Sequence, residues 1–99
     1  MAVRVELWEG GTLVDGVEQW WDAVEAALDS ADGEYALLES IDPYGAVTIT
    51  RQRLPDLARE CRQLPLVSSS QIRPALLKIA ELAEHAVATP DAELRFNGD

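Results

Sequence analysis

Apolar and polar residues alternate along residues 2–8, as they do in a strand with one buried face. The apolar row of this strand consists of Val3, Val5 and Leu7. The same alternation places Trp8 on the opposite, outward face. The sequence Glu-Gly-Gly-Thr at residues 9–12 then predicts a tight bend, after which we expect Leu13 and Val14 to return briefly beside the strand.

From Val17 to Asp29 the apolar residues recur at intervals of three and four, which predicts an amphipathic helix capped by Asp15. Its apolar stripe consists of Val17, Trp20, Trp21, Val24, Ala27 and Leu28. A second stripe, about 130° around the helix, carries the acidic residues Glu18, Asp22, Glu25 and Asp29. Because the adjacent Trp20 and Trp21 fall on the two edges of the apolar stripe, we expect one of them to be half exposed.

Two further strands are predicted at residues 34–41 and 46–50, which are rich in β-branched and aromatic residues and are bounded by bends. Residues 42–45, Asp-Pro-Tyr-Gly, separate them and follow the pattern of a type I turn. Proline presets the backbone at the second position, and the aspartate side chain accepts bonds from backbone amides ahead of it. We therefore expect a β-hairpin closed by this turn.

The second half of the chain predicts two helices and a last strand. One helix spans residues 51–64, and the next begins at Ser70 or Arg73 and is stopped by Pro90. Residues 92–96 alternate again as a strand. The resulting order, β-α-β-β-α-α-β, predicts a single α+β domain over residues 1–99, with about four mostly antiparallel strands and three helices packed on the sheet.

The charge of the chain is concentrated in its first part. The formal net charge is −10, and residues 1–42 carry eleven acidic residues against one basic residue, Arg4. Such a surface repels polyanions, so we expect neither a nucleic acid nor a membrane as partner and favour a protein with a basic surface. No apolar run is long enough to span a bilayer, and Cys61 is the single cysteine, which together predict a cytoplasmic location.

No metal or cofactor is predicted from the distribution of ligand residues. His85 is the single histidine, whereas zinc sites usually show paired histidine or cysteine ligands. Residues 28–39 approach the pattern of an EF-hand loop, but Leu28 stands where the first carboxylate ligand is needed. A catalytic pair of Cys61 and His85 lies in no recognisable nucleophile motif.

The acidic stripe is the strongest functional lead. Glu18 and Asp22, like Glu25 and Asp29, are like-charged residues four apart, an arrangement that costs a helix roughly 0.2–0.5 kcal/mol per pair. We therefore hypothesise a non-enzymatic protein that binds a basic partner through this stripe, as an immunity or antitoxin-like inhibitor does. The expected contact residues are Glu18, Trp21, Asp22, Glu25 and Asp29, with Trp8 beside them.

Two alternatives remain open at this point. An anionic ligand or substrate could be held by a site built from Asp42, Tyr44, Arg51 and Arg53, in which the arginines supply the charge and the tyrosine a cover. Alternatively, the acidic helix of one copy docks on the arginine-rich segment 51–62 of another, which would make the protein a structural subunit of a homodimer or larger homo-oligomer.

The chain also resembles a group of small, stand-alone bacterial proteins. The shared features are the Asp-Pro-Tyr-Gly sequence at 42–45, Gln52 ahead of a leucine-rich helix, and a closing aromatic-x-Gly-Asp, here Phe96 to Asp99. The resemblance implies a single domain over the whole chain and brings no chemistry with it.

Overall fold

The structure, a computed structural model, describes residues 1–31, 34–66 and 70–98. Four strands form one open sheet in the order β2-β1-β4-β3, and each neighbouring pair is antiparallel. The strands are β1 (Ala2–Glu9), β2 (Thr12–Trp20), β3 (Ala46–Ile49) and β4 (Ala92–Asn97). The predicted α+β class and its four antiparallel strands are confirmed.

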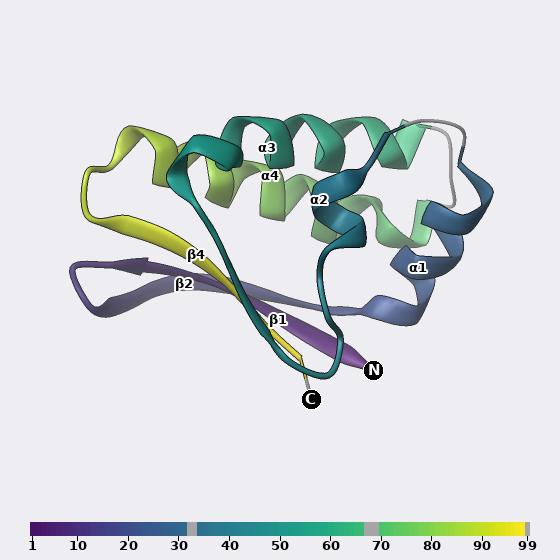
Figure 1. The fold of residues 1–99 in the computed structure, drawn as a ribbon, viewed down its shortest axis with the longest axis horizontal. Coiled ribbons are helices and arrows are strands. Elements are labelled where there is room, and N and C mark those ends of the chain that lie inside the picture. Colours follow the sequence, from purple (N-terminus) through teal and green to yellow (C-terminus); the bar gives the residue numbers. More distant parts are fainter. Residues whose placement is uncertain (32–33, 67–69, 99) are drawn as a thin grey trace.

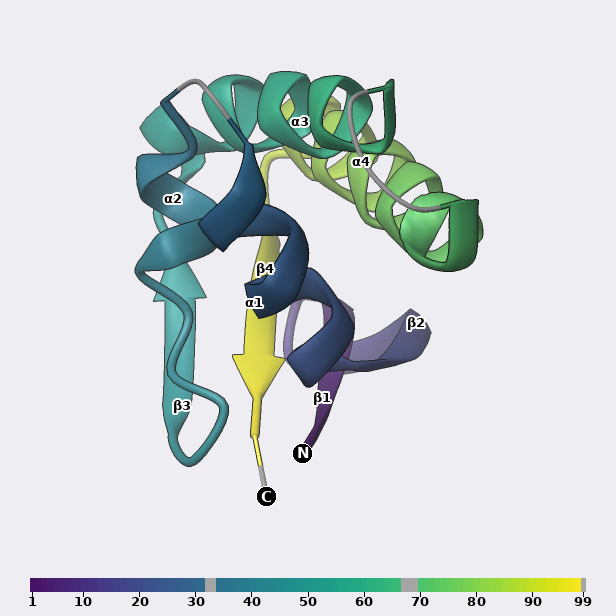
Figure 2. The same ribbon diagram turned by 90° about the vertical axis from the view of Figure 1, so that its right-hand side faces the viewer.

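Among the described residues, four α-helices accompany the sheet: α1 (Trp21–Ser30), α2 (Ala36–Glu39), α3 (Leu54–Gln63) and α4 (Arg73–Ala88). Short 3-10 turns flank the last two: η1 (Arg51–Arg53), η2 (Leu64–Leu66) and η3 (Ser70–Ile72). All the helices of the described residues lie on one side of the sheet, with α3 and α4 above it, α1 at one end and α2 beside α3 (Figures 1 and 2). None of the helices within the described ranges is long and apolar enough to cross a membrane.

The first two strands form a hairpin that is much longer than the brief return expected from the sequence. Gly10 and Gly11 both have positive φ angles, 57° and 82°, as the two central residues of a type I′ turn require. The β2 strand then pairs with β1 along its whole length and ends opposite Ala2, at Trp20. The helix predicted to start at Val17 therefore starts at Trp21, because residues 17–20 hydrogen-bond to β1 instead.

Residues 34–41 were predicted as a strand, and the structure corrects this to the short helix α2. The cause is Glu60 of α3, whose buried carboxylate accepts hydrogen bonds from the backbone amides of Leu37 and Leu38, at 3.3 and 3.0 Å. Those amides belong to the first turn of α2, which has no side-chain cap of its own. The Asp42–Gly45 turn therefore follows a helix and closes no hairpin.

The core lies between the sheet and the helices. Trp21, at the start of α1, is 1% exposed and meets Phe96 of β4 edge to face, with ring centroids 6.3 Å apart. The inward row of β1 predicted from the alternation, Val3, Val5 and Leu7, is buried as expected. No helix of the described residues covers the other face of the sheet (Figure 1), and the outward-facing residues of β1 and β4 are exposed or partly exposed.

Candidate functional site

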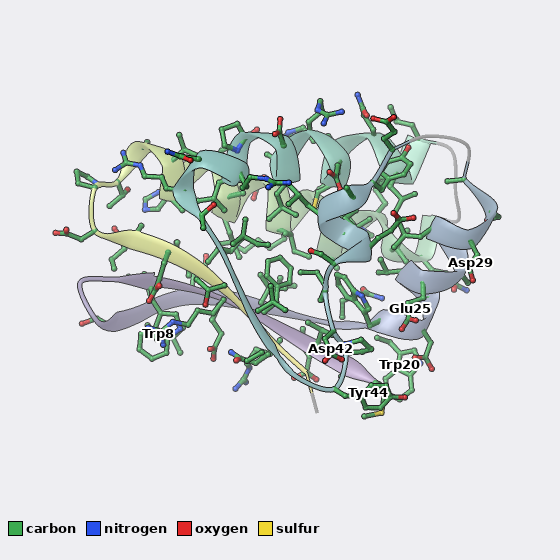
Figure 3. The ribbon with its side chains drawn as sticks, in the orientation of Figure 1. Trp8, Trp20, Glu25, Asp29, Asp42 and Tyr44 are labelled. Carbon is green, nitrogen blue, oxygen red and sulfur yellow. The ribbon has the colours of Figure 1, made fainter. Side chains whose placement is uncertain are left out.

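Three of the four predicted acidic residues lie together on the exposed side of α1. These are Asp22, Glu25 and Asp29, whereas Glu18 lies on β2, because the helix begins after it. The carboxylate of Asp22 is 3.0 Å from the amine of Met1, which offsets its charge. Within the described residues, Glu25 and Asp29 form no ion pair, and Figure 3 shows both at the α1 end of the molecule.

Beside these two carboxylates the surface is hollowed. We call this depression, which has a volume of about 150 Å³, the α1–α2 hollow. It is lined by Trp21, Glu25, Leu28, Asp29, Leu38, Glu39 and Ile41. Glu39 is not among the contact residues predicted from the sequence, because residues 34–41 were predicted to form a strand and lie in and around α2 instead. Three acidic side chains thus meet around a floor made largely of buried apolar groups.

The two adjacent tryptophans are placed in opposite environments. Trp21 was expected to contact a partner, but it is buried in the core and contributes only to the floor of the hollow. Trp20 is the exposed member of the pair, with 58% of its surface accessible. The expected half-exposed tryptophan is therefore Trp20, which is the last residue of β2 and not part of the helix.

Trp8 lies on the outward face of β1, as the alternation predicted, but far from the acidic helix. The guanidinium of Arg95 stacks over its ring at 4.5 Å from the centroid, and its indole nitrogen donates to Glu6 at 3.2 Å. Figure 3 places Trp8 and Trp20 near opposite ends of the sheet, so no joint aromatic patch forms. We therefore leave Trp8 out of the candidate site.

The Asp42–Gly45 segment forms the predicted turn. The carboxylate of Asp42 accepts the amide hydrogen of Tyr44 at 2.8 Å, and the amide of Gly45 donates to the Asp42 carbonyl oxygen at 3.2 Å. Tyr44 is 70% exposed and points away from the body of the protein (Figure 3). The turn rests against Gly98, whose amide donates to the carbonyl oxygen of Gly45 at 2.7 Å. These contacts give the turn a structural role.

The proposed ligand residues of the turn and of the arginine segment do not come together. Arg51 and Arg53 lie in η1, at the opposite end of β3 from Tyr44, about 20 Å along an extended chain. Arg51 donates to the carbonyl oxygen of Val87 at 2.8 Å. Arg53 lines a separate hollow between α2 and α3, which includes neither Asp42 nor Tyr44.

A larger groove of about 500 Å³ runs along the outer side of α3 and α4. Its walls include Arg59 and Arg62, but Arg62 donates two hydrogen bonds to Glu84, at 3.0 and 2.6 Å. These bonds lower the pKa of Glu84 and raise that of Arg62, so each group holds the other in its charged form. The positive charge of this groove is thus partly neutralised within the chain.

The structure offers no activated nucleophile at Cys61. The thiol is fully buried in α3, and burial, followed by the charge of Glu60, raises its pKa far above neutral pH. His85 is exposed on α4, where its ring lies 3.5 Å from the carboxylate of Glu9. In the described parts of the chain, no three histidine, cysteine or acidic side chains are grouped as metal ligands; Asp32 and Gly33 of the EF-hand pattern, like Asp99, lie outside those parts.

No model of a protein family matches the chain, and comparisons with curated proteins and with solved structures find no match either.

Proposed function

We propose that this protein is a non-enzymatic binding module that recognises another protein by accepting a basic side chain in the α1–α2 hollow. The observation that supports this most directly is the meeting of Glu25, Asp29 and Glu39 around one apolar-floored depression, without an ion pair to a described cation of their own chain. Unpaired carboxylates beside apolar surface attract a group that carries both positive charge and hydrocarbon.

The size of the hollow favours a side chain over a free small molecule. Pockets for drug-sized ligands measure roughly 300–1,000 Å³, whereas this hollow holds about 150 Å³. A lysine or arginine from a partner would lay its aliphatic stem along the partly exposed Leu28 and leave its charged end among the carboxylates at the rim. Each such exposed ion pair contributes about 0.2–1 kcal/mol, so specificity and association rate gain more than affinity does.

An inhibitor that masks a basic surface, such as the nucleic-acid-binding face of a nuclease, is the most concrete form of this proposal. The formal net charge of −10 would steer such a partner toward the protein over distances of about a Debye length. Raising the ionic strength should therefore slow association more than it speeds dissociation.

The test compares two charge-matched triple variants. The first changes Glu25, Asp29 and Glu39 to their amides, and the second changes the exposed acids Glu34, Glu81 and Asp91 in the same way. Both lose three negative charges, so a general effect of net charge weakens both alike.

Each variant and the wild type are tagged and used to capture proteins from extracts of their own source at low and high salt, followed by mass spectrometry. We expect a basic protein that is captured by the wild type and the control triple at low salt, and is lost with the α1–α2 triple. Equal recovery with all three would exclude the hollow as the contact.

A further inference from the structure

The β2 strand presents an open edge. It is the outermost strand of the sheet and is paired only on its β1 side (Figure 2). Its exposed apolar side chains are Leu13, Val14 and Trp20, with accessible fractions of 48%, 52% and 58%. Soluble proteins usually protect a long edge of this kind, because its free amides and carbonyls can pair with another chain.

The edge is regular over most of its length. Val14 is the extra residue of a β-bulge, since Leu7 pairs with Asp15 and Trp8 with Leu13. From Asp15 to Trp20 the pairing with β1 is uninterrupted. Asp15 is also fixed from the helix-covered side of the sheet by Lys78 of α4, whose amine lies 2.8 Å from its carboxylate. The amide of Gly16 donates to the other carboxylate oxygen of Asp15 at 2.8 Å, and the carbonyl oxygen of Trp20 accepts from the side chain of Gln19 at 2.9 Å. The strand is therefore an extended template on which an added strand would replace these two exposed side-chain contacts.

The outward face of this template is hollowed at Gly16. This residue pairs with Glu6 of β1, and because it has no side chain the face is open there, leaving a depression of about 440 Å³. The depression, which we call the Gly16 hollow, is lined by Arg4, Glu6, Leu13, Val14, Asp15, Gly16, Val17 and Glu18. Three of these are acidic and one is basic, and Asp15 is paired with Lys78.

We propose that the β2 edge binds an extended segment of another protein, which adds a strand to the sheet and places a lysine or arginine opposite Gly16. A residue at that position of an added strand lies on the same face as Gly16 and beside it. Its long side chain would cross the glycine and reach the carboxylates of Glu6 and Glu18. Backbone pairing would supply affinity, and the Gly16 hollow would supply the preference for a basic residue.

A second copy of the chain fits this edge less well. When two identical strands pair in an antiparallel arrangement, paired side chains point to the same face of the sheet. One residue must therefore face its own copy across the two-fold axis. Centring on Asp15 sets that carboxylate against itself. Centring on Gly16 or Val17 gathers the walls of both hollows, in which the acidic residues outnumber Arg4. Each copy also carries a net charge of −10, so self-pairing is opposed at long range as well.

This inference concerns a surface other than the α1–α2 hollow and does not depend on the function proposed for that hollow. The probe is a synthetic seven-residue peptide, Thr-Val-Thr-Lys-Thr-Val-Thr with blocked ends, titrated into the isotopically labelled protein and followed by amide chemical shifts. We expect saturable shifts along β2 and backbone contacts between the peptide and residues 15–20. A peptide with glutamate in place of the central lysine should bind at least about threefold more weakly.

Two variants test the chemistry of the hollow. Glu18→Gln should weaken binding of the lysine peptide by about two- to fivefold, which is the equivalent of one exposed ion pair. Glu81→Gln on α4 should leave the affinity for this peptide unchanged. Gly16→Val should abolish binding of both peptides, and its thermal melting is compared with the wild type, because a Cβ at this position would lie 3.0 Å from the carbonyl oxygen of Val5.

Several results would overturn the proposal. They are shifts confined to α1 and α2, equal affinity for the lysine and glutamate peptides, or no binding at millimolar peptide. Sedimentation of the protein alone as a dimer that Glu18→Lys disrupts would assign the edge to a second copy instead. Loss of partner capture by the α1–α2 triple variant with peptide binding intact would separate the two surfaces.

Discussion

Replacing Glu60 should cost more stability than any other single change to an acidic residue among those with described contacts. The side chain is 3% exposed, and its two oxygens accept the amide hydrogens of Leu37 and Leu38. These amides lie in the first turn of α2, which makes Glu60 the N-terminal cap of a helix more than twenty residues away in sequence. In Glu60→Ala both amides lose their acceptor inside the protein.

The magnitude follows from these contacts. A buried donor left without a partner costs about 1–3 kcal/mol, and loss of a helix cap typically costs about 1 kcal/mol. Because the two terms describe the same amides, they are not added, and the two donors together lead us to expect that Glu60→Ala lowers the free energy of unfolding by about 2–6 kcal/mol. Glu60→Gln keeps one carbonyl acceptor but loses the charge that favours the helix N-terminus, so about 1–2 kcal/mol is expected.

Urea denaturation followed by tryptophan fluorescence measures the effect, since Trp21 is buried in the core beside Phe96. Hydrogen exchange of the Leu38 amide gives a local readout, and its protection should fall further than that of core amides in β1. Glu81→Gln, an exposed change on α4, serves as the control and should stay within about 0.5 kcal/mol. If Glu60→Ala unfolds like the control and Leu38 keeps its protection, the tertiary capping argument is wrong.

Three further predictions concern other parts of the fold. Trp21→Ala should lose about 3–5 kcal/mol of unfolding free energy, whereas Trp20→Ala should lose less than about 1, as measured by urea titration with circular dichroism. Gly98→Ala should destabilise by about 1–3 kcal/mol in the same assay, because its Cβ would lie 2.1 Å from the carbonyl oxygen of Pro43. The ion pair with α4 lowers the pKa of Asp15 in the folded state, so its contribution is present at neutral pH and is lost as the pH falls below about 4. Asp15→Asn should therefore be less stable than the wild type at pH 7, and the difference should shrink in denaturation experiments near pH 3.

The fold class could be predicted from the sequence because the pattern of apolar and polar residues within most elements is enough to identify them. The alternation in residues 2–8, the proline-bounded helices and the last strand all appear where they were expected. The predicted number of strands, four, is right, but one of the four predicted strands is in the wrong place. Residues 34–41 were counted as a strand and are helical, while residues 12–20 supply the missing strand as β2. Two errors of assignment offset each other in the number of strands.

Both errors have non-local causes. Residues 17–20, Val-Glu-Gln-Trp, fit the helical spacing of apolar residues and do not alternate, and the pairing of β1 with its neighbour along its full length selects the strand. Residues 36–39 become helical where Glu60, from a later helix, caps their amides. Neither contact is visible within a window of ten residues. For the candidate site, the carboxylates of α1 were identified, but Glu39 depends on the second of these contacts and was missed.

The boundary between Trp20 and Trp21 determines how the acidic residues of the first half are distributed. At this point the chain changes from a period of two to a period of 3.6, which turns one indole outward and the next into the core. Of the four acids predicted to share one stripe, Glu18 then belongs to the β2 edge, and Asp22, Glu25 and Asp29 belong to α1. A single run of acidic sequence is thereby divided between two surfaces. Substituting Glu18 together with Glu25 would mix the two, and effects at well-separated sites normally add. The two surfaces must therefore be altered separately, because only then does a loss of binding identify the one that a partner contacts.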